Sequence, residues 1–358
     1  MVRKITRKIT NKHLIKQHLS ILRKLHRRSG LFVASLKKKT GYDKAWLRDN
    51  FYECLAFFVL KDYDVCKKTY KALLKIFEKH EYKIDHAIAK KPEHKHQYIH
   101  ARYHPHTFNE FWEEWGNKQN DAIGAILWGI ARLEGAGVKV MEREKDWELV
   151  QKLVYYLNSI EYWHDPDSGM WEEDEETHAS SVGACLAGLL AIRKYVDVPE
   201  HMIEEGWKSM NHLLPRESQK KYVDLAQLSL IYPYNIVSRE QRTMILSNIE
   251  YHLLKARGVI RYKNDAYYNK NPDGYSEEAE WAFGLSWLAI IYESLGDKEK
   301  AKYFLDKAVS VDTPKGMPEL YYSQTNEYND NTPLGWAESM FVIALHDFND
   351  EHFKKNKK

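Results

Sequence analysis

The sequence has few of the features that mark secreted or membrane-bound proteins. Only three of its 358 residues are cysteines, Cys54, Cys66 and Cys185, and they lie far apart in mostly apolar surroundings. This odd, scattered set is typical of core thiols in a reducing compartment. No apolar stretch follows the basic N-terminal residues, and no run approaches the ~18 apolar residues of a transmembrane helix. We therefore expect a cytoplasmic protein with no membrane partner.

The chain also lacks a strong charge of one sign and any obvious linker. Its 54 Lys and Arg residues nearly balance 51 Asp and Glu residues, and the basic excess lies in the first 40 residues and the last few. No nucleic-acid recognition motif accompanies these runs, which favours solvated helix faces over nucleic-acid binding. No stretch rich in Pro, Gly and Ser interrupts the chain. We expect one domain over residues 1–358, with a basic tail near 350–358.

Helical periodicity dominates what is present. Apolar residues at i, i+3 and i+4 predict about twelve helices. Some are amphipathic and charged, at 63–79, 144–161, 199–213, 238–256 and 297–309. Others are apolar nearly all round, at 121–134, 178–195, 223–232 and 278–296, and such helices are buried under amphipathic ones. Further helices are predicted at 12–26, 50–62 and 333–346, and short hairpin strands at 96–104 and 258–268.

The apolar helices recur with a period. An acidic residue stands before or at the start of these four helices and of the helix predicted at 50–62, with successive spacings of 72, 51, 52 and 56 residues: Asp49, Asp121, Glu172, Asp224 and Glu280. A recurrence near 50–60 residues indicates a repeated unit, here an outer helix, a turn and an inner helix. Six such units close into an all-α (α/α)6 toroid. The loops before the inner helices would then meet at one end around a central cavity.

These loops combine tryptophan with acidic, amide and arginine side chains, in residues 41–50, 111–121, 169–176, 261–281 and 316–336. Aromatic rings stack on the faces of sugar rings, and arginine and carboxylate groups bind hydroxyls in pairs. The pattern therefore favours a carbohydrate site over the alternative that each tryptophan only fills a seam between helices. The 11 Trp and 24 Tyr residues of the chain fit either interpretation.

Two carboxylates in different surroundings are the minimum for glycoside hydrolysis. Glu172 follows Trp171 and is crowded by further acids. Apolar contact and like charges favour its neutral form, whereas a helix N-terminus favours the anion. Glu319 stands apart from other acids, so we expect it to stay ionised as a base. We interpret Glu175 and Glu176 as carboxylates at a helix N-terminus.

Five segments also resemble, in the same order, motifs of the glucoamylase-type glycosidases, glycoside hydrolase family 15: "YDKAWLRD", "WGNKQNDAIG", "MWEED", "RYKNDAYYNKNP" and "MPELYY" with "TPLGW". The resemblance covers roughly residues 41–346. It implies that Glu172 is the general acid and Glu319 the general base. It also implies a substrate-binding set made up of Tyr42, Trp46, Arg48, Asp49, Trp115, Gln119, Asp121, Trp171, Glu173, Arg261, Trp281 and Trp336.

The resemblance implies an inverting, exo-acting enzyme that releases β-glucose from α-linked gluco-oligosaccharides and needs no cofactor or metal. Inversion places the two carboxyl groups about 6.5–9.5 Å apart. Leu320 stands where the family commonly has glutamine. No segment resembles the β-sandwich or starch-binding modules that accompany some members, so we expect short oligosaccharides as substrates. The linkage cut and the oligomeric state stay open.

Five histidines lie close together in one stretch, at His94, His96, His100, His104 and His106. His-x-His pairs can bind zinc, but no cysteine or well-spaced carboxylate joins them. We therefore expect no metal here and interpret the stretch as a loop or hairpin on the rim of the cavity.

Two other functions compete with hydrolysis. The regulatory α subunit of phosphorylase kinase contains a domain of similar appearance, so the chain could be a glycan sensor without turnover. The presence of both Glu172 and Glu319 favours an enzyme. A phosphorylase on the same fold would need a phosphate site, and no phosphate cradle is evident.

Overall fold

The computed structural model describes residues 11–111, 113, 116–269 and 277–355, with side chains up to residue 348. This part of the chain is mostly helical, and no helix in it is both long and apolar enough to cross a membrane. The elements in chain order are α1 (Asn11–Leu25), η1 (Lys38–Thr40), β1 (Ala45–Trp46), α2 (Leu47–Val59), α3 (Tyr63–Lys79), α4 (Glu81–Ala89), η2 (Lys95–Gln97), β2 (Arg102–Tyr103), α5 (Asn120–Gly135), α6 (Glu144–Ile160), α7 (Ala179–Ile192), α8 (Glu200–Leu213), η3 (Leu225–Leu230), α9 (Arg239–His252), β3 (Glu280–Trp281), α10 (Phe283–Ser294), α11 (Lys298–Ser310), β4 (Leu320–Tyr321) and α12 (Gly335–Lys355).

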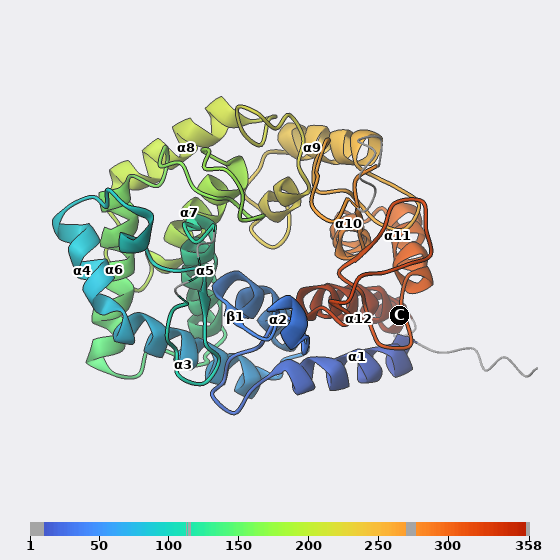
Figure 1. Cartoon of the computed structure of the whole chain (residues 1–358), viewed down its shortest axis with the longest axis horizontal. Helices are drawn as coiled ribbons and strands as arrows, with labels where there is room; N and C mark the ends of the chain where they lie inside the picture. The colour runs from blue at the N-terminus through green and yellow to red at the C-terminus, as the bar shows by residue number, and fades with distance from the viewer. Residues whose placement is uncertain (1–10, 112, 114–115, 270–276, 356–358) are drawn as a thin grey trace, which may run out of the picture.

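The helices form two concentric rings (Figure 1). The inner ring contains α2, α5, α7, η3, α10 and α12, each in contact with the next, and α12 closes the ring on α2. Helices α3, α6, α8, α9, α11 and α1 cover these elements from outside, in the same order. The structure is therefore the (α/α)6 toroid that the periodicity predicts.

The inner helices pack closely because small residues line their contacts. Helix α7 is apolar nearly all round and is buried along most of its length. It crosses α5 at Gly124 and Gly188. A Cβ atom at Gly124 would lie 2.4 Å from the Ala184 carbonyl oxygen, and one at Gly188 would lie 2.3 Å from the Gly124 carbonyl oxygen. Only glycine allows the two backbones to approach so closely.

One inner helix differs from its prediction. The fourth inner element is the 3₁₀ helix Leu225–Leu230, not the α-helix predicted at 223–232. Asp224 caps its start by accepting a hydrogen bond from the Ala226 amide at 2.7 Å. Pro233 has no amide hydrogen to continue the helix and stops it after less than three turns. The fourth inner position is therefore shorter than the other five.

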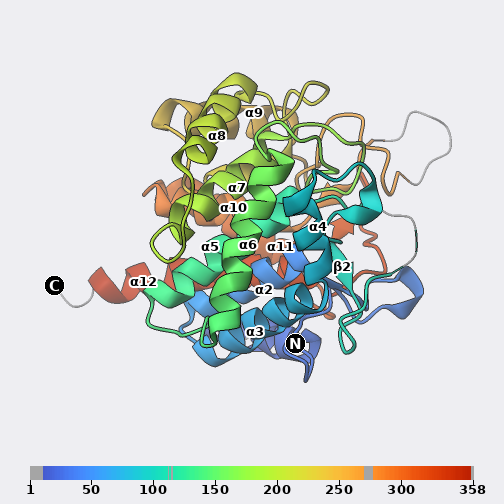
Figure 2. The ribbon, with the colours of Figure 1, turned by 90° about the vertical axis from the view of Figure 1, so that its left-hand side faces the viewer.

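Both predicted strand segments form short local antiparallel bridges, Tyr103 with Glu110 and Val259 with Leu254, and both also pair with distant parts of the chain. Strand β2 pairs antiparallel with β1, which joins the second inner-helix loop to the first. Val259 bridges to Trp281, and β3 pairs with β4, which joins the fifth and sixth loops. These pairings gather the loops at one end of the toroid. Figure 2 shows β2 on that side and the C-terminal end of α12 on the opposite side.

Helix α4 is an addition to the predicted set. It follows α3 directly and packs against α6 at the periphery of the toroid (Figure 1). Its apolar residues Ile84 and Ala87 are fully buried against that neighbour. A nine-residue helix presents too few turns for its periodicity to stand out from the surrounding charged sequence.

Candidate active site

A cavity of about 250 Å³ opens at the end of the toroid where the inner helices begin. Eleven of the fourteen predicted site residues line it: Tyr42, Trp46, Arg48, Asp49, Trp171, Glu172, Glu173, Arg261, Trp281, Glu319 and Trp336. Gln119 and Asp121 lie behind this surface, where they hydrogen-bond residues that line the cavity. Trp115 lies outside the described residues.

Aromatic rings form one wall of the cavity. Trp336 stacks on Phe283 with a centroid distance of 4.8 Å and an interplanar angle of 14°, and Trp171 lies nearly parallel to Trp336 at 6.2 Å. The Trp171 indole donates a 2.7 Å hydrogen bond to Asp224, which fixes the plane of its ring. These rings offer the flat apolar surface on which a sugar ring stacks.

Glu319 is almost fully buried and is held by three side chains. Its Oε1 accepts a hydrogen bond from the Tyr42 hydroxyl at 2.9 Å, and its Oε2 accepts from the amides of Asn329 at 2.5 Å and Asn331 at 2.7 Å. Burial raises the pKa of Glu319, and the three donors counter part of that rise. All three bonds are made to a carboxylate, so they favour the ionised form that a general base needs.

Glu172 has a different setting. Its side chain is half-buried, and its Oε1 accepts a 2.8 Å hydrogen bond from the Gln119 amide. Its backbone lies in the left-handed region with φ of 64°, which costs a residue other than glycine about 1–3 kcal/mol. Such strain persists only where neighbouring contacts impose it, so the loop that carries Glu172 must be firmly held.

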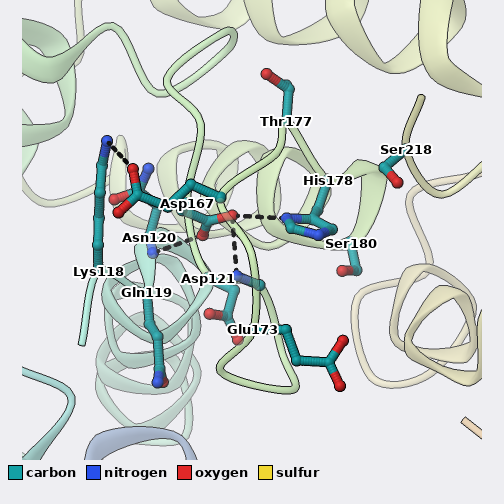
Figure 3. A network of polar contacts seen from close by, with 12 residues as sticks. Lys118, Gln119, Asn120, Asp121, Asp167, Glu173, Thr177, His178, Ser180 and Ser218 are labelled. Carbon is teal, nitrogen blue, oxygen red and sulfur yellow. Dashed lines mark hydrogen bonds and ion pairs between the residues drawn. The ribbon is translucent and has the colours of Figure 1, made fainter. Parts of the chain in front are cut away.

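The base of this loop is closed by a buried ion pair. Asp167 and His178 contact each other at 2.9 Å between Oδ1 and Nδ1. Asp167 also accepts a hydrogen bond from the Asn120 amide nitrogen at 2.9 Å, and Figure 3 shows both partners converging on its carboxylate. Burial lowers the pKa of His178, but the hydrogen bond and charge of Asp167 outweigh it and raise the pKa to about 9. The charged pair therefore ties the loop to the starts of α5 and α7.

Arg48 connects the same loop to the inner ring. The guanidinium is buried and binds Asp121 through two hydrogen bonds, of 2.5 Å from Nε and 2.9 Å from Nη2. It also donates to the carbonyl oxygens of Met170 at 2.8 Å and Gly169 at 3.2 Å. Asp121 thus orients Arg48, and Arg48 supports the backbone just before Glu172.

Asp49, next to Arg48 in the first turn of α2, lines the cavity directly. Burial raises the pKa of Asp49 to about 7, and the charges of Glu172 and Glu319 add to this rise against the opposing effect of Arg48. Near neutral pH the group is therefore divided between its protonated and ionised forms. It can both donate hydrogen bonds to hydroxyl groups and accept them from the same groups.

Arg261 is fixed on the far side of the cavity. It binds Asp265 through two hydrogen bonds of 2.6 and 2.7 Å and Glu173 through one of 2.8 Å. Burial raises the pKa of Glu173, but Arg261 and Lys221 outweigh it, so the pKa is lowered. Arg261 also lies over the Trp281 ring, 4.8 Å from its centroid. Glu173 is therefore an anion that orients Arg261.

The prediction for Glu175 and Glu176 is wrong. Helix α7 begins at Ala179, and its first turn holds no acidic residue. Glu175 instead pairs with Lys95 at 3.3 Å, and Glu176 accepts a hydrogen bond from the Lys220 amide nitrogen at 3.0 Å. The acidic run lies in the loop before the helix, because the Asp167–His178 pair and the 167–176 bridge keep these residues out of helical conformation.

The histidine stretch lies beside the second inner-helix loop. His100 is buried, and burial lowers its pKa to about 3, with the charges of Lys83 and Arg102 adding to the effect. His94 and His96 stack on each other at 5.5 Å. Within the described ranges, no group of three or more His, Cys, Asp or Glu side chains has the arrangement of a metal site.

Sequence reasoning missed several residues of the site. Asn329 and Asn331, which hold Glu319, stand in "NDNTP" just before the last inner helix, and two amides at i and i+2 beside a catalytic candidate were a usable signal. Asp265, which orients Arg261, stands four residues after it. Asp167 and His178 gave no local signal, because their partnership depends on how the loop closes.

Comparisons with known proteins now bear on this site. The sequence pattern described as "Glycosyl hydrolases family 15" matches residues 11–351. The chain belongs to this family. The matched residues include both rings of helices and all the inner-helix loops.

Related proteins are distant in sequence. The probable phosphorylase b kinase regulatory subunit alpha of Caenorhabditis elegans is 26% identical over 372 residues, which cover 84% of this chain and 30% of the relative. The chain thus spans about a third of the length of this group of curated relatives. An uncharacterized glycosyl hydrolase of Methanocaldococcus jannaschii is 26% identical over 267 residues, covering 64% of this chain and 42% of that protein.

Solved structures show the same fold. A wild-type glycosidase superposes with a TM-score of 0.80 at 18% identity, covering 95% of this chain and 97% of its own. A glucoamylase from Saccharomycopsis fibuligera superposes with a TM-score of 0.67 at 14% identity, with 98% of both chains covered. At these identities the likeness shows that the chain shares the fold of these two proteins.

Proposed function

We propose that this chain is an exo-acting glycoside hydrolase that releases β-glucose, with inversion, from the non-reducing end of α-linked gluco-oligosaccharides. The observation that carries the proposal is the placement of Glu172 and Glu319 in one small cavity, each held by different partners. At about 250 Å³ the cavity is smaller than the ~300–1,000 Å³ typical of ligand sites. A site of this size suits a single terminal sugar ring.

In this mechanism Glu172 protonates the glycosidic oxygen, and Glu319 removes a proton from a water that attacks the opposite face of the sugar. The buried hydrogen bonds to Glu319 support its role as the base. Trp171, which precedes Glu172 in the chain, belongs to the aromatic wall of the same cavity. Protonation and water attack then occur at separate carboxylates.

The remaining residues would hold the terminal glucose. Arg48 and Asp49 bind the 4- and 6-hydroxyl side, Trp46 and Tyr42 pack around the ring, and Arg261 binds the far side. Arg48 and Arg261 each keep a carboxylate partner, Asp121 and Asp265, so their guanidinium groups are already oriented before substrate arrives. Such preorganisation is what makes electrostatic contacts effective in catalysis.

The leaving group would leave the cavity through a wider groove of about 1,080 Å³. This groove shares Glu172, Glu173 and Tyr267 with the cavity and continues past Lys221 and Tyr262. The linkage cut is then set where the cavity meets the groove, at the loop that carries Glu172. The proposed substrates are the short oligosaccharides whose second sugar fits this junction.

A panel of maltose, isomaltose and trehalose, with the anomer of the first product observed by NMR, tests the proposal. We expect glucose release from at least one disaccharide. The glucose from the non-reducing end should form as the β anomer, beyond the α/β mixture released from the reducing end of maltose or isomaltose and beside the one α-glucose that each trehalose releases. Formation of that non-reducing glucose as the α anomer would contradict inversion. Turnover that requires inorganic phosphate would indicate a phosphorylase instead.

A second function has a specific observation in its favour. Several relatives are regulatory subunits of phosphorylase b kinase. A glycan sensor of that kind would bind the disaccharides of the panel and release no glucose. The presence of both carboxylates in one cavity favours the enzyme.

A further inference from the structure

A second groove lies at the other end of the toroid. It has a volume of about 880 Å³ and lies between the last turns of α7, the outer helix α8 and the segment that joins η3 to α9. Its lining residues are Trp128, Ala187, Leu190, Ala191, Trp207, Asn211, Tyr234, Asn235, Ile236, Val237, Ser238 and Gln241. None of them lines the candidate active site.

The groove is present because η3, the fourth inner element, is shorter than the other inner helices. Because η3 ends at Leu230, no helix fills the lower part of the ring beside α7. The chain passes there as an irregular segment in which Asn235 adopts a left-handed φ of 48°. The candidate active site is remote from this point. Twelve residues separate Ala179, at the start of α7, from Ala191 in the groove, which is about 18 Å along a helix.

The lining of the groove has a consistent chemistry. It carries no charged side chain, although 29% of the whole chain is charged. Trp207 is 36% exposed on the outer face of α8, and Trp128 lies at the inner side with its edge against Tyr234. Arg132 lies over the Trp128 ring, 5.3 Å from its centroid, so Trp207 is the indole whose flat face suits a neutral ligand with apolar faces.

Amide groups supply the polar part of the lining. The Gln241 side chain is occupied, since it accepts from the Ser238 backbone nitrogen at 2.9 Å and donates to the Asn211 Oδ1 at 3.3 Å. In the part of the chain that the structure describes, the Asn211 amide nitrogen and the whole Asn235 side-chain amide have no protein partner. These exposed groups can donate hydrogen bonds to hydroxyls and accept them in return.

We propose that this groove is a second carbohydrate site, separate from the candidate active site, that binds a stretch of neutral α-glucan chain. Trp207 is its stacking platform, and Asn211 and Asn235 bind hydroxyl groups. The volume exceeds that of the candidate active-site cavity severalfold, which suits several sugar units rather than one chain end. The choice of an α-glucan as ligand rests on the proposed function, whereas the neutral, polyhydroxylated class rests on the lining.

Affinity electrophoresis of the full chain in native gels that contain soluble maltodextrin tests this site. The parent protein carries Glu172→Gln, so that it does not digest the gel, and Trp207→Ala or Asn235→Ala is added to it. Loss of one central aromatic contact weakens a binding site by about five- to tenfold, so we expect retardation to fall by that factor for Trp207→Ala. Tyr303→Ala, which removes an exposed tyrosine on α11 outside both sites, should leave retardation unchanged.

Maltose hydrolysis keeps this test independent of the proposed function. In a chain with an intact Glu172, Trp207→Ala should hydrolyse maltose as the unmodified protein does. Equal retardation of all variants, or none of the parent protein, overturns the second site. A dimer in size-exclusion chromatography that Trp207→Ala dissociates also overturns it, because the groove is then an interface between copies. If maltose is not hydrolysed at all, the proposed function fails while the retardation result still decides the groove.

Discussion

The two candidate catalytic carboxylates are positioned in contrasting ways. Glu319 is buried and held directly by the side chains of Tyr42, Asn329 and Asn331. Glu172 is half-buried, has Gln119 as a direct side-chain partner, and lies on a strained backbone. Its position depends on the closure of the loop around it. One carboxylate is thus held in a buried position by three hydrogen bonds, whereas the other is half-buried and stands on a strained backbone.

The difference fits the two proposed roles. A base must stay ionised next to a substrate, and direct donors serve that purpose. An acid must gain and lose a proton in each turnover, so several fixed donors to its anion would hinder it. Separate substitutions in the two loops therefore test how each carboxylate is held and which of the two is the acid.

Removal of either carboxylate should have the largest effect. Glu172→Gln and Glu319→Gln should each lower kcat on a reactive disaccharide by about 10²–10⁴-fold, the usual cost of losing an acid or base. The two variants should separate on α-glucosyl fluoride, whose leaving group needs little protonation. Glu172→Gln should regain activity on this substrate and Glu319→Gln should not, as followed by fluoride release.

If Glu319→Gln regained activity on α-glucosyl fluoride and Glu172→Gln did not, Glu319 would be the acid and Glu172 the base. Equal recovery of both variants, or of neither, would contradict the division between acid and base. Glu204→Gln, on the exposed part of the outer helix α8, is a matched control that should hydrolyse both substrates normally.

A smaller loss is expected when the loop of Glu172 is displaced without touching its carboxylate. A Cβ atom at Gly116 would lie 2.5 Å from the Glu172 carbonyl oxygen and 2.7 Å from its carbonyl carbon. Gly116→Ala must therefore shift that backbone. A misplacement of about 1 Å can cost about 10²-fold in rate. We expect kcat to fall by that order while KM changes less, as measured by steady-state kinetics.

Gly135→Ala is the matched control for this substitution, because its Cβ meets only the Tyr195 hydroxyl at an ordinary 3.5 Å. It should leave kcat unchanged. Full activity of Gly116→Ala would show that the loop tolerates displacement, and the contrast between the two carboxylates would then be lost.

The ion pair below this loop should control stability in a pH-dependent way. The pKa of His178 is raised from 6.5 to about 9 in the folded protein. Its contribution, roughly 3 kcal/mol for a shift of this size, is fully present below pH 6.5 and is lost as the pH rises through about 9. His178→Asn should therefore lower the free energy of unfolding most at pH 6, and the difference from the unmodified protein should narrow by pH 9.5.

Urea unfolding at both pH values measures this effect. His212→Asn, on the exposed part of α8, should show no such dependence. If His178→Asn lowers the free energy of unfolding by the same amount at both pH values, the charge on His178 contributes nothing to the stability of its pair with Asp167.

The general plan of the fold was predictable from the sequence. The inner helices are apolar on all sides and the outer ones on one face, so their alternation specifies two rings. The fourth inner element was not predictable in the same way. Residues 223–232 have the composition of a buried helix, but Asp224 and Pro233 leave too short a segment between them to form one.

The residues that line the cavity could be predicted from the sequence. The residues whose position depends on a tertiary contact could not. Eleven predicted residues line one cavity, because each stands in a segment that leads into an inner helix or in the first turn of that helix, and the ring brings these segments to the same end. The interpretation of Glu175 and Glu176 was wrong, since the start of α7 is set by His178, whose bond to Asp167 is a tertiary contact. Helix-terminus patterns cannot report such a contact.

The smallest effect is expected at the donors to Glu319. Asn329→Ala removes one donor that stabilises the carboxylate, so the pKa of Glu319 should rise further above its usual range. Since a base acts only when ionised, the acid limb of the pH–kcat profile should move to higher pH, by about one unit for one such hydrogen bond. Above that limb kcat should change little. Asn326→Ala, which removes an exposed amide of the same loop that contacts Arg257 instead, should leave the profile in place. A shift of the alkaline limb in Asn329→Ala would assign Glu319 the role of the acid and reverse the contrast between the two loops.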